Sequence, residues 1–468
     1  MKRMRNRFLP LTYAILISLL ILVGCTSRED PAETLDLCGN HACGDLVMVT
    51  ADTSSEGFHY LNPSLSPDGS RVLFTADWTA LPATSQYNED DFHTNFRQMI
   101  VMPLAARVEP MRDLAEQGAR LLKLKERNLP QFNVQGEYLS EVVNARKGDP
   151  IWMDDLNVIF RLELSRGYRL FQANIADPDT CRLAPLYFEE LDRSQSGRFY
   201  QHFEPALSPD KRWLAFTRSS CLIPDSLETC TQSELMILDM ETAGDGNAFD
   251  AVAFAVTREA SRLEKPNWSP DGRKIVFSAG LDMAGEAEWG TELFTIDFDT
   301  TGLAAGMVAL DNNLTRLTYT EYSDGDPISG VFNTVPRYSN DGQRIFFVST
   351  RRMPTTTHHD RNIWVMPADG SLDPEIYFFT RSDDVDPSVN PDGSILLSSQ
   401  LGFTTEMLDF LEEEAYQRAR QQNQERIANP NNEEAILTEL EMRNVATDER
   451  NTLELFEGVM SHLYVYRR

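Results

Sequence analysis

A short pattern of a polar turn followed by an apolar strand recurs along most of the chain. Each copy contains a proline, then an apolar or aromatic residue, then a Ser-Pro-Asp-Gly turn or a variant of it, and then a short apolar run. Proline presets φ, aspartate bonds the local backbone and glycine tolerates positive φ, so each copy predicts a strand, a tight turn and a buried strand. Six copies are present, the second of them degenerate: residues 62–74, 149–160, 204–216, 265–277, 335–347 and 386–397.

A third apolar segment follows every copy. These segments are Met99–Met102, Leu170–Ala173, Leu235–Leu238, Leu293–Ile296, Ile363–Met366 and Leu463–Tyr466. Leu-Thr and Phe-Thr pairs, such as Leu317-Thr318 and Phe379-Thr380, indicate fourth strands in several units. Six units of four short strands predict an all-β chain folded as a six-bladed β-propeller.

The last unit lacks a fourth strand of its own, because the chain stops at Arg468, just after its third strand. The segment 46–50 lies ahead of the first copy, where the other fourth strands lie ahead of theirs. We therefore expect this N-terminal strand to join the sixth blade and close the ring. Closure leaves only short, protected sheet edges.

The repeated Ser-Pro-Asp-Gly turn, with an aromatic or aliphatic residue before the serine, resembles the repeat of TolB-like propellers. The same repeat occurs in the propeller domains of prolyl-oligopeptidase-type enzymes and of the tricorn protease. The resemblance covers residues 46–468 and implies the fold, but propellers host many unrelated functions. TolB proteins carry a separate α/β domain before the propeller and this chain has only residues 25–45 there, so TolB's partners are not assigned to it.

Residues 1–24 are expected to form an export signal. Four basic residues among the first seven precede an apolar run over residues 8–23, as in a secretory signal peptide. A transmembrane helix is the alternative, but Pro10 interrupts the run, which is shorter than the roughly 20 residues that a bilayer requires.

The segment 22–25, Leu-Val-Gly-Cys, resembles a lipobox. This resemblance implies removal of residues 1–24, diacylation of Cys25 and a linker over residues 25–45. Two or more acyl chains anchor a protein stably, since each buried CH₂ contributes about 0.8 kcal/mol. Thr26 follows the cysteine, which favours the outer membrane, with the protein facing the periplasm or the cell surface.

Charge narrows the range of partners. The chain has 43 basic and 72 acidic residues, and removal of residues 1–24 leaves 39 basic residues and a net charge near −33. Such a surface repels phosphate backbones and anionic headgroups. Nucleic acid is therefore not expected as a partner, whereas a protein or peptide with a basic surface, or a divalent cation, fits this charge.

Export places the cysteines in an oxidising compartment. Cys221 and Cys230 flank a short loop and are the expected disulfide. Cys38 and Cys43 are a second possible pair, which leaves Cys181 over, so the sequence leaves the pairing open. A zinc site at Cys38, His41 and Cys43 is the alternative, but it lacks a fourth ligand and a known spacing.

Two insertions lengthen the blades, at about residues 83–135 and 403–461. In the first, a helix is expected over Met111–Glu126. In the second, helices are expected over Glu406–Arg426 and Glu433–Asn444. An apolar stripe at helical spacing is expected to pack on the blade's own outer face, with a docking surface for a partner as the alternative; it comprises Met407, Leu408, Leu411, Ala415 and Tyr416.

Catalytic motifs were sought and not found. The chain has no Gly-x-Ser-x-Gly elbow, His-Glu-x-x-His motif or phosphate-binding glycine loop, so no catalytic residue and no resident metal or cofactor are expected. His358-His359-Asp360 is the one local cluster that suits a metal, but it is expected in a solvated loop. Acidic turns at Asp383-Asp384 and Asp324-Gly-Asp326 offer oxygens to Ca²⁺, yet they lack the spacing of a calcium loop.

A ligand site, if present, is expected at the mouth of the central channel. The residue before each motif proline is predicted to lie there, either as part of a site for a basic group or metal or as a solvated rim charge: Asn62, Asp149, Glu204, Lys265 and Asp386. The sequence thus predicts an outer-membrane lipoprotein that acts as a protein- or peptide-binding scaffold. The alternative is a glycan- or peptide-processing enzyme with paired carboxylates at this mouth.

Overall fold

The structure is a computed structural model of the whole chain. It describes residues 45–50, 60–77, 97–104, 118–123, 147–164, 167–187, 199–222, 230–243, 250–285, 290–299, 313–320, 331–351, 361–378, 383–400, 405–428, 436–455 and 462–467. The expected signal, lipidation site and linker, with Cys38 and Cys43, lie outside the described residues apart from Asp45, the last residue of the linker.

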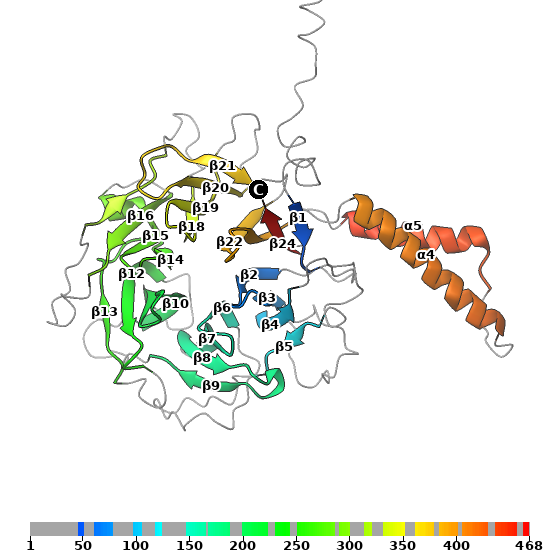
Figure 1. Cartoon of the computed structure of the whole chain (residues 1–468), viewed down its shortest axis with the longest axis horizontal. Helices are drawn as coiled ribbons and strands as arrows, with labels where there is room; N and C mark the ends of the chain where they lie inside the picture. Colours follow the sequence, from blue (N-terminus) through cyan, green and yellow to red (C-terminus); the bar gives the residue numbers. More distant parts are fainter. Residues whose placement is uncertain are drawn as a thin grey trace, which may run out of the picture.

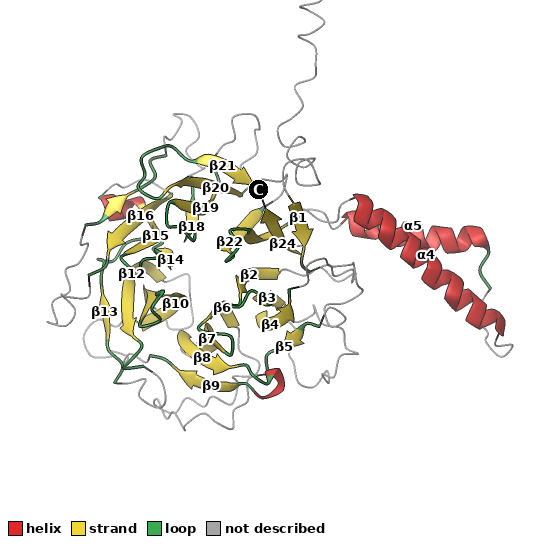
Figure 2. Cartoon of the chain, in the orientation of Figure 1, coloured by secondary structure: helices red, strands yellow, loops and turns green. Residues whose placement is uncertain are grey.

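Six four-stranded antiparallel sheets surround a central axis (Figure 1), which confirms the predicted six-bladed propeller. Figure 2 shows that strands joined by loops form the disc, that the 3-10 helices Pro178–Thr180 and Leu281–Ala284 are short, and that the long helices lie outside it. The first blade contains β2 (Tyr60–Leu65), β3 (Arg71–Asp77), β4 (Arg97–Pro103) and β5 (Arg120–Leu121). The second contains β6 (Lys147–Trp152), β7 (Asn157–Leu164), β8 (Gly167–Asn174) and β9 (Arg182–Pro185).

The remaining blades follow the same order from the channel outward. The third contains β10 (Phe199–Leu207), β11 (Trp213–Cys221), β12 (Cys230–Asp239) and β13 (Ala253–Ala255). The fourth contains β14 (Glu264–Trp268), β15 (Lys274–Gly280), β16 (Thr291–Asp297) and β17 (Thr315–Arg316). The fifth contains β18 (Asn333–Tyr338), β19 (Arg344–Ser349), β20 (Asn362–Pro367) and β21 (Glu375–Phe378). The sixth contains β22 (Asp384–Val389), β23 (Ile395–Ser399), β24 (His462–Arg467) and β1 (Asp45–Met48).

The N-terminal strand closes the ring as predicted. Strand β1 pairs antiparallel with β24, from Asp45 opposite Arg467 to Met48 opposite Tyr464. One residue further on, the Val49 N–H donates to the carbonyl of Leu463 at 2.7 Å. The last blade is therefore held together by strands from both ends of the chain.

The repeated turn is held by its serine. In the first copy the Ser66 hydroxyl donates to Asp68 at 2.6 Å and accepts from the Arg71 N–H at 2.9 Å. Hydrogen bonds from Ser66 and Ser70 lower the pKa of Asp68 to about 2. The same two serine bonds recur in the third, fourth and fifth copies, at Ser208, Ser269 and Ser339. These bonds close the turn that joins the inner strand to the buried second strand.

The core lies between neighbouring blades. The second strands are almost completely buried, and their aromatic residues include Phe74, Phe160 and Phe277. The Trp152 indole N–H donates to the carbonyl of Ser64 in the preceding blade at 2.9 Å, and the Trp268 indole N–H makes the same kind of bond two blades later, to the carbonyl of Ala206 at 2.9 Å. Trp152, Trp268 and Tyr338 are buried in clusters that contain residues of neighbouring blades.

Two helices form a hairpin that projects from the rim of the disc near β1 and β24 (Figure 1). They are α4 (Thr405–Ala428) and α5 (Glu439–Leu455). The first begins and ends close to the predicted bounds, whereas the second begins six residues later than expected and runs eleven residues further. Thr438 sets its start with a capping box, in which the Thr438 hydroxyl accepts the Glu441 N–H and the Glu441 carboxylate accepts the Thr438 N–H and hydroxyl.

Two expectations about the insertions were wrong. The apolar residues Ala415 and Tyr416 of the predicted stripe pack against Met442 and Ala446 of α5, not on the blade, and the side chains of Met407, Leu408 and Leu411 lie outside the described part of the chain. Within the helix expected over residues 111–126, residues 120–121 instead form β5, which pairs with β4 and buries Leu121; residues 111–117 and 124–126 lie outside the described residues. Neither described helix is long and apolar enough to span a membrane.

Candidate ligand site at the channel mouth

The five predicted mouth residues converge at one end of the channel. They line a single cavity of about 440 Å³, together with the prolines that follow four of them and the core residues Trp152, Trp268 and Tyr338. Each lies where its inner strand is bulged, and each has a positive φ, between 49° and 56°. The sixth such position is Val335, with a φ of 53°. The repeat therefore imposes one backbone conformation at six places around the mouth.

Lys265 is the hub of this cluster. Its Nζ lies 3.3 Å from Asp149 Oδ1, 3.5 Å from Glu204 Oε1 and 3.3 Å from Asn62 Oδ1. An ammonium group has three N–H donors, so these three acceptors satisfy it. The basic group that these carboxylates contact is therefore Lys265 of the protein itself.

The carboxylates also join neighbouring blades through the backbone. Asp386 accepts the Asn62 N–H at 3.0 Å, Asp149 accepts the Glu204 N–H at 3.4 Å, and Glu204 accepts the Lys265 N–H at 2.7 Å. Each bond joins the residue before a motif proline to its counterpart in the next blade. Acidic residues are therefore structurally useful at this position, because a left-handed backbone turns its N–H away from the sheet ladder.

The two central carboxyl groups differ in pKa. Burial raises the pKa of Asp149, but Arg161 and Lys265 outweigh it and bring the pKa to about 2. Burial dominates at Glu204 and raises its pKa to about 7, against the opposing effect of Lys265. The pKa of Lys265 is raised because Asp149 and Glu204 outweigh its burial. At neutral pH the cluster holds an ionised Asp149, a charged Lys265 and a partly protonated Glu204.

Sequence reasoning missed two arginines of this region. Arg161 Nε lies 2.8 Å from Asp149 Oδ2, and its guanidinium stacks on the Tyr168 ring at 4.8 Å. Arg337 lines the cavity, and its Nη1 donates to the carbonyl of Pro336 at 2.9 Å. Arg337 stands two residues after Val335 in the fifth repeat, so its place in the motif was the available signal.

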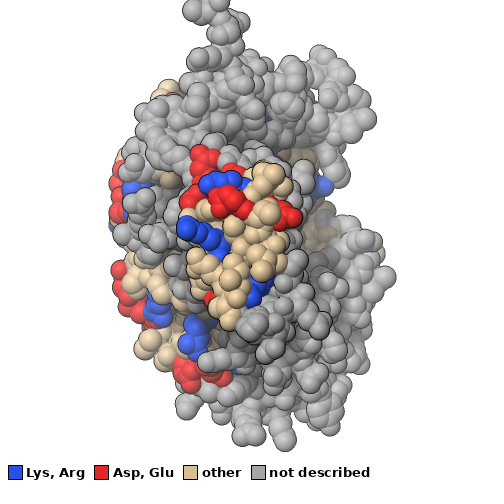
Figure 3. Space-filling view, turned by 90° about the vertical axis from the view of Figure 1, so that its right-hand side faces the viewer, with Lys and Arg blue, Asp and Glu red and all other residues tan. Residues whose placement is uncertain are grey.

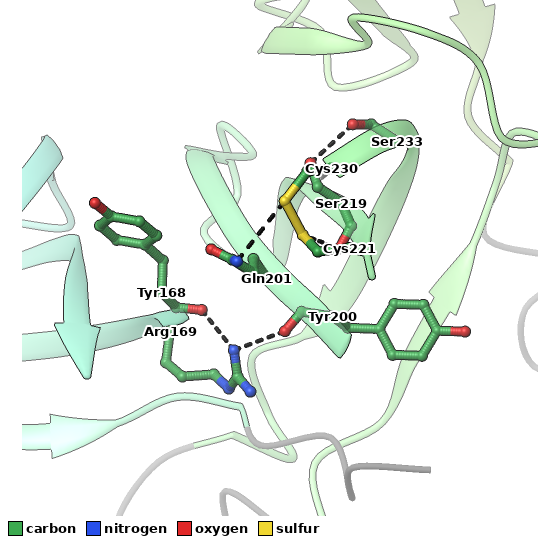
Figure 4. The surroundings of a disulfide bond; sticks show 8 residues. All are labelled: Tyr168, Arg169, Tyr200, Gln201, Ser219, Cys221, Cys230 and Ser233. Atoms are coloured by element: carbon green, nitrogen blue, oxygen red, sulfur yellow. Dashed lines mark hydrogen bonds between the residues drawn. A yellow bond between two sulfur atoms is a disulfide. The ribbon is translucent and has the colours of Figure 1, made fainter. Parts of the chain in front are cut away.

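The expected disulfide joins Cys221 and Cys230 across the ends of β11 and β12. Figure 4 shows Gln201 reaching the bond from the neighbouring strand, with its Nε2 3.7 Å from Cys230 Sγ. Ser219 and Ser233 bond each other beside it at 2.8 Å. Cys181 is a buried free thiol whose pKa is raised to about 12, mainly by burial. The Cys221–Cys230 disulfide lies on the third blade, away from the mouth residues.

The described residues include no group of three or more His, Cys, Asp or Glu side chains arranged to hold a metal ion. Asp383 instead accepts hydrogen bonds from the Arg361 backbone and guanidinium, and Asp384 accepts one from Ser399. His358-His359-Asp360 and Asp324-Gly-Asp326 lie outside the described residues.

The chain is a six-bladed β-propeller built on a TolB-like repeat, with a polar cavity at its channel mouth. No protein-family model and no curated protein matches its sequence. Similar solved structures include a protein assigned as TolB from Agrobacterium tumefaciens, at 14% identity and a TM-score of 0.40, covering 74% of this chain and 93% of that one.

Two further similar solved structures are a second TolB and a lyase. TolB from Acinetobacter baumannii is 14% identical with a TM-score of 0.40, over 71% of this chain and 61% of that one. An oligogalacturonate lyase from Vibrio parahaemolyticus is 11% identical with a TM-score of 0.36, over 90% and 98% of the two chains. At such values no activity or partner is transferred to this protein.

Proposed function

We propose that this protein is a lipid-anchored propeller of the bacterial envelope that binds another protein, and that its helical hairpin is the docking surface. The observation that carries the proposal is the hairpin itself, which projects from the disc (Figure 1) and packs its helices on each other. A projecting, preformed pair of helices suits a helix-face docking mode.

The hairpin is organised before any partner binds. Tyr416 donates to the Glu439 carboxylate at 2.6 Å, and the Arg443 guanidinium stacks on the Tyr416 ring at 4.5 Å. Asn423 bonds both the N–H and the carbonyl of Leu437, at 2.7 and 2.9 Å. These contacts fix the helices relative to each other, so docking would cost little ordering entropy.

Large apolar side chains are exposed on this hairpin. The exposed fractions are 59% for Ile427, 61% for Ile436, 68% for Leu440 and 47% for Val445. Figure 3 views the molecule from the side on which the hairpin projects, and shows uncharged surface there between Lys, Arg, Asp and Glu side chains. An apolar surface with a charged margin is typical of a protein-binding site.

The location in the envelope rests on the sequence. The basic and apolar N-terminus and the lipobox-like ending support removal of residues 1–24 and diacylation of Cys25. Labelling with a fatty-acid probe and membrane fractionation test this directly. Wild-type protein should be labelled and membrane-bound, and Cys25→Ala should be unlabelled. Label retained by Cys25→Ala would refute the anchor.

Affinity capture after mild crosslinking, followed by mass spectrometry, tests the docking surface. The variant Ile427→Gln/Leu440→Gln removes two exposed apolar side chains without touching the contacts between the helices. Leu372→Gln is the matched control, because Leu372 is also 68% exposed but lies on the propeller. A stoichiometric partner that the double variant loses and the control keeps supports the proposal. No partner, or a partner insensitive to both changes, overturns it.

The alternative is a glycan- or peptide-processing enzyme at the channel mouth. The different pKa values of Asp149 and Glu204 favour it, since acid and base pairs are tuned in this way. Both oxygens of each carboxylate, however, already contact Lys265, Arg161 or a backbone N–H, which supports a structural role. Turnover of glycans or peptides that is abolished by Glu204→Gln would favour the enzyme.

A further inference from the structure

Arg337 differs from the other cations of the channel mouth. Lys265 and Arg161 each lie within ion-pairing distance of a carboxylate. Among the described residues no carboxylate oxygen lies that close to Arg337, and its one hydrogen bond is to the carbonyl of the adjacent Pro336. A guanidinium carries five N–H donors in a planar fork, so most of its donors have no protein acceptor.

The cavity makes this guanidinium accessible to a small ligand. Arg337 and Asp386 both line it, from the neighbouring inner strands β18 and β22. Asp386 acts on Arg337 electrostatically, opposing the effect of burial, which lowers the pKa of the arginine. Only Oδ2 of Asp386 is engaged, by the Asn62 N–H. The mouth therefore presents the guanidinium of Arg337, most of whose N–H donors are unused, near the unengaged Oδ1 of Asp386.

The hydrogen bonds that join neighbouring blades at the mouth explain why the part of the mouth beside Arg337 is open. Asp386, Asp149 and Glu204 each accept the N–H of the next blade, and Lys265 neutralises two of them. At the position that follows Lys265 the residue is Val335, whose side chain can neither accept an N–H nor pair with a cation. The internal network thus stops at the blade that carries Arg337.

We propose that the channel-mouth cavity binds a carboxylate that has a hydrogen-bond donor on the adjacent carbon, with Arg337 binding the carboxylate and Asp386 accepting from the donor. An α-hydroxy acid and the C-terminal residue of a peptide share this chemistry. Arginine and carboxylate form paired, parallel hydrogen bonds that are stronger than neutral ones. A cavity of about 440 Å³ suits a small molecule or one terminal residue. This site is separate from the hairpin, so the proposal does not depend on the docking partner.

Calorimetric titration of the full chain distinguishes the two sources. The probes are glycerate, with 3-hydroxypropionate as its analogue lacking the hydroxyl on the carbon adjacent to the carboxylate, and acetyl-trialanine with a free or an amidated C-terminus. Binding of glycerate or of the free-acid peptide supports the site and identifies its source. Binding of neither, or equal binding of the amidated peptide, overturns the proposal.

Two variants tie the binding to Arg337. Arg337→Gln should lower the affinity for the bound probe by about tenfold or more, as expected for loss of a charge-assisted pair. The affinity of Arg337→Lys should fall between that of Arg337→Gln and that of the wild type. Arg344→Gln is the matched control, since Arg344 begins the next strand and does not line the cavity. Thermal unfolding of each variant checks the fold. Unchanged affinity in a folded Arg337→Gln protein refutes the assignment.

Discussion

Replacing Lys265 by methionine tests whether the channel-mouth network holds the propeller together. Methionine keeps the length and the unbranched Cβ of lysine, so the positive φ of 56° is retained. Among the described residues, the change removes the one cation that forms an ion pair with Glu204 and one of the two that do so with Asp149, whose side chains are 14% and 9% exposed. Removing one partner of a buried ion pair costs about 3 to 5 kcal/mol, and we expect a loss of stability of this size at pH 8.

The loss should depend on pH with a definite sign. The pKa of Glu204 is about 7 in the folded protein, against an ordinary value of 4.5, so Glu204 is protonated at pH 5 and then needs no cation. Its raised pKa means that ionisation costs stability as the pH rises through this window. We therefore expect Lys265→Met to cost about half as much at pH 5, where Asp149 alone is left without its lysine.

Equilibrium urea unfolding at pH 5 and pH 8, followed by tryptophan fluorescence, measures both quantities. The matched control is Lys274→Met, since Lys274 is 51% exposed and bonds Asp297 at 2.8 Å on the surface. A surface pair of this kind contributes about 1 kcal/mol or less. The reasoning is refuted if Lys265→Met costs no more than the control, or if its cost is the same at both pH values.

Three further predictions concern other parts of the ring. Trp268→Phe removes the bond to the Ala206 carbonyl and should lower the unfolding free energy by about 1 to 3 kcal/mol; an unchanged urea midpoint would contradict this. Cys221→Ser/Cys230→Ser opens a link between residues nine apart and should cost about 2 to 3 kcal/mol, a cost that reductant should reproduce in the wild type and not in the variant. Burial lowers the pKa of His462 to about 4, so stability should fall by about 3 kcal/mol as the pH drops from 6.5 to 4; His462→Gln should flatten that part of the pH profile, and an equal slope in both proteins would argue against it.

The insertions show where local pattern misleads. Leu121 lies in a segment whose apolar spacing suits a helix, yet it is buried as part of an outer strand because β4 needs a partner there. The start of α5 at Glu439 follows from the capping box at Thr438 and Glu441. The sequence itself carries this signal for the start of the helix. Tyr416 was expected on the blade, and only the folded hairpin shows that α5 covers it.

The sequence by itself determined the number of blades, the order of their strands and the closing role of the segment 46–50, and it indicated Cys221 and Cys230 as the expected disulfide. These features depend on contacts between residues close together in the chain, such as the Ser66 and Asp68 turn, or on a pattern repeated six times. Only the tertiary structure decided what the mouth residues do. Asn62 and Asp386 are 324 residues apart, and Lys265 reaches Asn62 across 203. Ring closure alone brings such groups together, because charge and hydrogen-bond partners across a channel leave no trace in local periodicity.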